Sequence, residues 1–215
     1  MSTIKIEDLE AIVMNMILTT IGLPTLSELE KALSKIPNIV ELTYVENPNR
    51  KSHEFYNELI ERIKTTCKDR VKIRRLPLSH AINYNLPSTP ALIIHGIFNG
   101  RLRYIGLMED LMEYMIKLSI AYAGKSLELK KPKLHLQPTN ITIDLYVVPG
   151  VPCIRTLKIL LPLPAYFNVV LNVIDVRENS ELARKYPGSG VPLTVVREKN
   201  YFKRGVITNV DQLLK

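Results

Sequence analysis

Two X-Pro dipeptides stand at corresponding places in this chain, each directly before a short apolar run. They are Thr89-Pro90 and Val191-Pro192, and their prolines are 102 residues apart (192 − 90). The same offset aligns Tyr44-Val45 with Tyr146-Val147. Because proline cannot donate to a strand ladder, each proline favours the first position of a strand. The repeat predicts that the chain contains two copies of one structural unit.

Hydrophobic periodicity predicts the same order of elements, β-α-β-α-β-β-α, in both copies. In the first copy we predict strands over 38–45, 70–76, 91–95 and 102–105, and helices over 52–68, 80–83 and 108–123. In the second copy we predict strands over 141–147, 169–176, 193–196 and 201–204, and helices over 153–161, 180–186 and 209–214. Two further helices, over 6–19 and 26–36, precede the first copy. Thr25 or Ser27 is the expected cap of the second of these helices.

The charged segment 125–140 contains two prolines and no sustained periodicity, so it is the expected boundary between the units. We expect a helical extension over 1–24, a first unit over 25–137 and a second unit over 138–215. Each unit is predicted to be an α/β unit with a central mixed sheet flanked by helices. The apolar face of helix 6–19 must be buried, either against the first unit or in a homodimer.

The net charge of +8 is spread evenly along the chain. Residues 1–137 hold 19 basic and 15 acidic side chains, and residues 138–215 hold 10 and 6. Nucleic-acid binders concentrate their positive charge, so this distribution argues against such a partner. The longest uncharged runs, 11–27 and 159–174, contain proline, and acidic residues precede the first run. We therefore expect a soluble, cytoplasmic protein without a membrane role.

Cysteine and histidine are sparse and do not form a recognisable site. Cys67 and Cys153 stand in unrelated contexts, which is not the pattern of a disulfide framework. The four histidines lack metal-ligand spacing, and no glycine-rich phosphate loop occurs. We expect neither a metal nor a cofactor, and we place Cys67 in the core.

The segment 171–196 (LNVIDVRENSELARKYPGSGVPLTVV) combines a strand, a short helix ending in tyrosine, and Gly-Val-Pro before a buried strand. In this it resembles the thioredoxin superfamily. Two fused units of this size resemble the glutaredoxin-like protein disulfide oxidoreductases of thermophiles, which carry C-x-x-C in one or both units. The resemblance implies that Pro192 is a cis-proline opposite the active-site cysteines, and that Pro90 is its counterpart. Together with Val191 and Thr89, these prolines would line grooves for an extended substrate.

By the same resemblance, the dithiol position holds Gly150-Val151-Pro152-Cys153. In a dithiol site the first thiolate attacks the substrate and the second resolves the mixed disulfide. Gly150 replaces the attacking cysteine, so only the resolving sulfur remains, beside Val151 and Pro152 in the expected substrate groove. In the first unit the corresponding segment, 48–51 (PNRK), contains no thiol. Two-electron disulfide exchange is therefore not expected within either segment.

A second register treats Cys153 as the attacking residue of a monothiol motif, with Thr156 in the resolving position. The position of Asp144 favours the first register, because it falls where thioredoxins keep a buried carboxylate that exchanges protons with the resolving cysteine. Asp144 is thus a candidate proton acceptor for Cys153. The alternatives are a relic of the ancestral site, or an acid at the solvated end of the strand.

Two functions follow from the resemblance. The first is a module that binds a peptide or protein partner in the cis-proline groove, with dithiol chemistry lost. The second is thiol-disulfide exchange through Cys153, resolved by an external thiol. We expect the first, because the missing residue is the one that starts the chemistry. Arg50, Lys51 and His53, near a helix start, form either a further candidate anion site or a solvated cluster.

Overall fold

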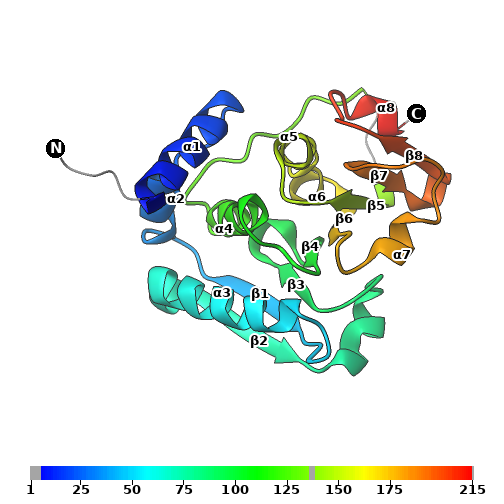
Figure 1. Ribbon diagram of the computed structural model, residues 1–215. Coiled ribbons are helices and arrows are strands. Elements are labelled where there is room, and N and C mark those ends of the chain that lie inside the picture. The colour runs from blue at the N-terminus through cyan, green and yellow to red at the C-terminus, as the bar shows by residue number, and fades with distance from the viewer. Residues whose placement is uncertain (1–5, 136–138, 215) are drawn as a thin grey trace.

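The computed structural model describes residues 6–135 and 139–214, which build a single eight-stranded mixed sheet (Figure 1). The strand order is β2-β1-β3-β4-β6-β5-β7-β8. The first unit consists, in chain order, of β1 (Val40–Val45), α3 (Ser52–Cys67), η1 (Lys68–Arg70), β2 (Val71–Leu76), η2 (Leu78–Tyr84), β3 (Ala91–Ile94), η3 (Gly96–Phe98), β4 (Leu102–Ile105) and α4 (Leu111–Ala123). The second unit consists, in chain order, of β5 (Thr139–Val147), α5 (Val151–Leu160), α6 (Leu163–Tyr166), β6 (Asn168–Asp175), α7 (Ser180–Ala183), β7 (Leu193–Val196), η4 (Arg197–Lys199), β8 (Tyr201–Arg204) and α8 (Asp211–Leu214).

Both halves have the predicted order of elements and the same topology. In the first, β1 pairs in parallel with β2 and antiparallel with β3, which pairs antiparallel with β4. In the second, β5 does the same with β6 and β7, and β7 pairs with β8. Several details differ from the prediction. The segment after β2 is a 3₁₀ helix. A further short helix, α6, begins at Leu163 directly after its N-cap Pro162, and Pro164 lies in its first turn, where proline is tolerated.

The two halves are joined by a strand pairing that the sequence did not predict. Strand β4 runs parallel to β6, from Leu102 opposite Leu171 to Ile105 opposite Ile174. Each half thereby covers one sheet edge of the other, which leaves β2 and β8 as the outer strands. The sheet is continuous across the two units, so they are held in a fixed orientation.

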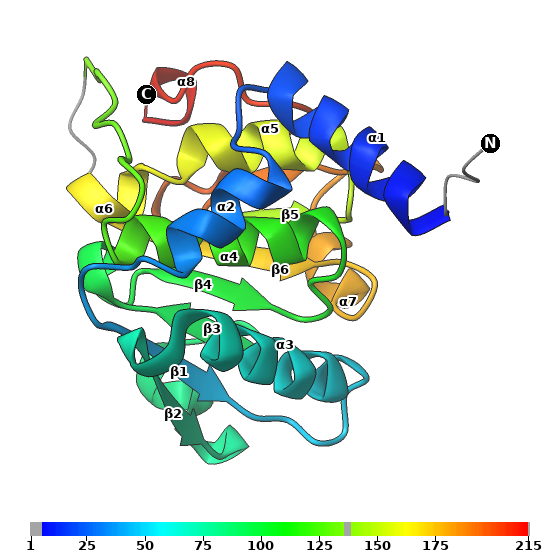
Figure 2. The ribbon, with the colours of Figure 1, turned by 90° about the vertical axis from the view of Figure 1, so that its left-hand side faces the viewer.

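The helices α2, α3, α4 and α5 pack on one face of the sheet, here called the helical face (Figure 2). The main core lies between them and inward side chains such as Leu42, Tyr104 and Leu145. The opposite face carries η2 and α7 over two smaller clusters. Because strand side chains alternate, neighbouring residues of one strand belong to different faces. This alternation decides which of the candidate residues meet.

Two helices precede the first sheet strand, α1 (Ile6–Thr20) and α2 (Leu26–Leu33). Thr25 caps α2 in a reciprocal capping box with Glu28, as one of the two predicted caps. Leu18 of α1 is fully buried, whereas Met16 is 64% exposed. Within the described part of the chain, every helix is too short or too polar to cross a membrane.

Candidate functional site

The loop between β5 and α5 contains the motif predicted to replace a dithiol. Strand β5 ends at Val147 and α5 begins at Val151, so Gly150 takes the N-cap position. The amide of Ile154 donates to the carbonyl of Gly150 at 3.1 Å, which closes the first helical turn. Cys153 lies inside that turn. Gly150 thus stands directly before α5, and Cys153 stands three residues later.

Thr156 has a structural role instead of a resolving one. Its hydroxyl donates to the carbonyl of Pro152 at 3.1 Å and accepts from the amide of Ile207 at 3.3 Å. The side chain is fully buried. Both partners occupy the hydroxyl, which ties α5 to the segment before α8.

Gly150 has room for a side chain. Its backbone is extended, with φ 172° and ψ 152°, a conformation that any residue adopts. A Cβ atom built there would meet only the Cδ atom of Pro152, at 3.9 Å. The chain therefore does not require glycine at this position on steric grounds.

The thiol of Cys153 is shielded, with the residue only 2% exposed. Burial raises the pKa of this thiol, and the nearby carboxylate of Asp175 raises it further, against a hydrogen bond from the backbone at Val148. Cys67 is buried in the core, as predicted, and burial raises its pKa to about 11. Neither cysteine is in a disulfide. Both sulfurs are thus held in the protonated, weakly nucleophilic form at neutral pH.

Asp144 does not face Cys153, which corrects the role expected for it. Leu145, the next residue, packs in the helical-face core with Cys153, whereas Tyr146 packs on the opposite face. By strand alternation Asp144 points to the same side as Tyr146. There it accepts two hydrogen bonds from Arg197, at 2.7 and 2.9 Å. It is also buried, so it is neither a proton acceptor for Cys153 nor a solvated strand end.

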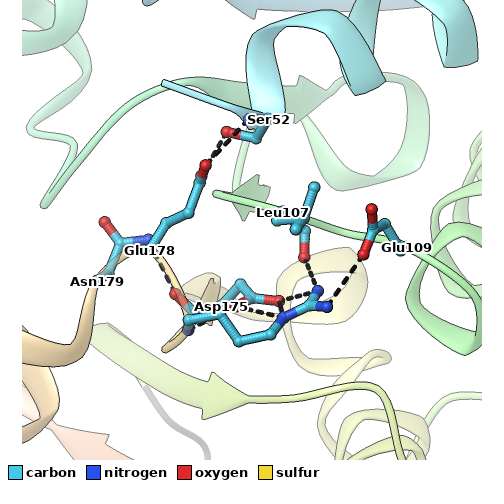
Figure 3. Close-up of polar contacts among 7 residues, drawn as sticks. Ser52, Leu107, Glu109, Asp175, Glu178 and Asn179 are labelled. Atoms are coloured by element: carbon cyan, nitrogen blue, oxygen red, sulfur yellow. Dashed lines mark hydrogen bonds and ion pairs between the residues drawn. The ribbon is translucent and has the colours of Figure 1, made fainter. Parts of the chain in front are cut away.

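The carboxylate on the helical face near Cys153 is Asp175, a residue that the sequence analysis missed. It is fully buried at the end of β6, and Arg177 donates to it from Nε and from Nη2, the latter at 2.6 Å (Figure 3). Burial raises the pKa of Asp175, while the bonds from Arg177 lower it. An acid closing the apolar run LNVID was the available signal.

The two X-Pro bonds, Thr89-Pro90 and Val191-Pro192, are cis, as the resemblance implied. Extension of the β5–β7 register, in which Tyr146 is opposite Leu193, places Pro192 opposite Val147 and thus beside the loop that holds Gly150. In the second unit, within the described residues, neither backbone group of Val191 has a hydrogen-bond partner. Val191 is partly exposed. A backbone edge is therefore available next to the GVPC loop.

The equivalent residue of the first unit, Thr89, is less accessible than Val191. Thr89 is buried, and its hydroxyl accepts a hydrogen bond from Asn47 at 2.9 Å. The Glu178 carboxylate from the second unit binds the amide of Ser52, at 3.0 Å, and its hydroxyl (Figure 3). Arg50 donates to the carbonyl of Glu178 at 2.8 Å. The anion at this helix start is therefore supplied by the protein itself.

The other members of the expected anion cluster do not join this contact. His53 is instead hydrogen-bonded to the hydroxyl of Tyr44, at 2.9 Å, and to Asn57, at 3.2 Å. Lys51 is exposed. Over residues 6–135 and 139–214, no three histidine, cysteine or acidic side chains are placed to share a metal ion.

Similarity to known proteins is found at the level of structure. No protein-family model and no curated protein matches the sequence. The NTD_N/C domain of the alkylhydroperoxide reductase AhpF from Enterococcus faecalis superposes with a TM-score of 0.70 and 11% identity, over 88% of this chain and 97% of that one. A protein disulfide oxidoreductase from Aeropyrum pernix gives 0.65 and 14%, over 84% and 85%. The predicted fold, two tandem thioredoxin-like units, is therefore confirmed.

Proposed function

We propose that this protein is a binding module that takes an extended peptide or an unfolded protein segment along the backbone edge at Val191 in the second unit. The observation that carries the proposal is the combination at one loop of an unpaired edge and a missing nucleophile. Gly150 stands in the attacking position, and Cys153 behind it is buried with a raised pKa. The fold is similar to that of a disulfide oxidoreductase, but position 150 lacks the cysteine that would attack a substrate disulfide.

The edge at Val191 suits an extended partner. Its backbone amide and carbonyl have no partner within the described chain, and an added strand would satisfy both. The space over Gly150 is open, and Pro152 is exposed beside it. In the first unit the equivalent residue, Thr89, is buried and its hydroxyl is bonded to Asn47. The proposal therefore assigns one binding edge to the molecule.

A side chain placed on Gly150 tests this assignment. The probe is a reduced, carboxymethylated unfolded protein, which has no free thiol and exposes extended backbone. Gly150→Phe fills the open space without backbone strain, so binding should weaken about tenfold or more. Pro48→Phe, at the equivalent exposed position of the first unit, is the matched control and should bind like the wild type. Absence of wild-type binding, or equal loss in both variants, would refute the assignment.

A second function, single-thiol exchange through Cys153, is favoured by one observation: this residue lies in the first turn of α5, where the helix dipole favours a thiolate. The two functions differ in the reactivity of the thiol. In a Cys67→Ser background, alkylation of Cys153 at neutral pH should be at least about tenfold slower in the native protein than in urea. Equal rates would show that the thiol is not shielded in the native protein and would select the exchange function.

A further inference from the structure

Helix α1 carries an apolar stripe that nothing in the described chain covers. Leu9, Ile12, Val13 and Met16 are 55%, 48%, 49% and 64% exposed. Their spacing of three, four and seven residues places them on one side of the helix. The other side is already used, because Leu18 packs into the main core. A helix that is apolar on both sides is normally buried on both, so the stripe indicates a contact surface.

The stripe lies beside a groove with charges of opposite sign at its two ends. Toward the start of α1, a hollow of about 510 Å³ is lined by apolar side chains including Leu111 and Pro149, together with the acidic residues Glu10 and Asp110. Toward the end of α1, a second hollow of about 330 Å³ is lined by Val151 and Arg155. Both hollows share Val13 and Ile17, so they form one continuous surface.

We propose that this surface binds a second copy of the chain, with the two α1 helices antiparallel about a two-fold axis. In such an isologous contact each patch meets itself, so the apolar middle of one stripe packs on the middle of the other. The acidic end, with Glu10, then faces Arg155 of the partner subunit, and the same pair forms twice. A single surface with an acidic end, an apolar centre and a basic end is complementary to its own two-fold copy.

The charges also argue against an anionic lipid surface as the occupant. Glu10 and Asp110 are exposed at the rim of the groove and would be repelled by acidic headgroups. The proposed dimer does not depend on the peptide-binding proposal, but the dimer contact would lie next to the proposed peptide-binding edge. Pro149 and Val151 flank Gly150, so the partner's α1 would form one wall of the approach to the Val191 edge.

Sedimentation equilibrium over a range of concentrations tests the contact. The wild type should be a dimer, and Met16→Glu should weaken association at least about tenfold, because it places a charge within the apolar contact. Ile82, which is 83% exposed far from α1 in the sequence, supplies the matched control: Ile82→Glu should leave the dimer intact. A wild type that stays monomeric at its highest soluble concentration would overturn the proposal, as would a Met16→Glu protein that dimerises normally.

A charge exchange tests the antiparallel arrangement separately. Glu10→Arg and Arg155→Glu should each weaken the dimer, because each places like charges together at two symmetric positions. The double variant Glu10→Arg/Arg155→Glu should recover most of the wild-type affinity. Failure of the double variant to recover would overturn the antiparallel register. Binding of a monomeric wild type to phosphatidylserine vesicles would instead identify a lipid surface as the occupant and refute the dimer.

Discussion

The carboxylate of Glu178 accepts hydrogen bonds from both the backbone amide and the hydroxyl of Ser52, at the start of α3 in the other unit. The neighbouring Arg177 reaches the first unit at a second place, where it donates to the carbonyl of Leu107 and to the carboxylate of Glu109 (Figure 3). Two adjacent side chains after β6 therefore hold the first unit at two places, the start of α3 and the segment after β4.

Glu178→Gln should lower the free energy of unfolding by roughly 1–2 kcal/mol, because a charged acceptor at a helix N-terminus becomes neutral. The measurement is urea denaturation of the full chain, with the slope of the transition compared to that of the wild type. Glu58→Gln is the control: this side chain is 74% exposed and should change stability by less than about 0.5 kcal/mol. Equal effects of the two substitutions would mean that Glu178 contributes no more than a surface charge.

Gly150→Cys should form a reversible disulfide with Cys153. The extended backbone accepts a Cβ atom, and the two positions are three residues apart across the start of α5. The readout is the mass of the variant in a redox buffer, which should fall by two hydrogens on oxidation. Gly150→Ser and Gly150→Cys/Cys153→Ser should show no such change. A correctly folded variant that never oxidises would exclude the GVPC register.

Arg197→Met should destabilise the fold by about 3 kcal/mol or more, because it leaves the carboxylate of Asp144 buried with the amide of Asn172 but without its ion-pair partner. Asp144→Asn/Arg197→Met should recover part of this loss, since the unpaired charge is removed. In both variants the alkylation rate of native Cys153 should match that of the wild type, because the pair lies on the opposite face of the sheet. A changed rate would restore a link between Asp144 and Cys153.

The stability that Asp175 contributes should depend on pH in a defined direction. Burial raises its pKa in the folded chain above the ordinary value of 3.8. The protonated form is therefore favoured by folding, so this contribution is present below about pH 4 and is lost as the pH rises through the raised pKa. The difference in unfolding free energy between wild type and Asp175→Asn should fall from acidic to neutral pH. A difference that grows with pH would mean that the pair with Arg177 outweighs burial.

Much of the local structure is predictable from the sequence because it depends on residues close in the chain. Apolar periodicity identified the strands, and the element order was right in both units. Gly150 stays a predicted replacement for an attacking cysteine, and α5 begins directly after it. The prediction for Asp144 was wrong, because its distance from the motif along the chain does not say which face of the sheet its side chain takes.

The sequence by itself determined the duplicated units, because repeated element order is a local pattern, and its resemblance to the thioredoxin superfamily implied the two cis-prolines. Only the tertiary structure decided how the two units contact each other. The pairing of β4 with β6 joins backbone groups that carry no side-chain signal, and it brings Glu178 onto Ser52 across 126 positions. That contact places an anion from the second unit at the start of α3. It depends on the relative placement of two folded units, which no local pattern encodes.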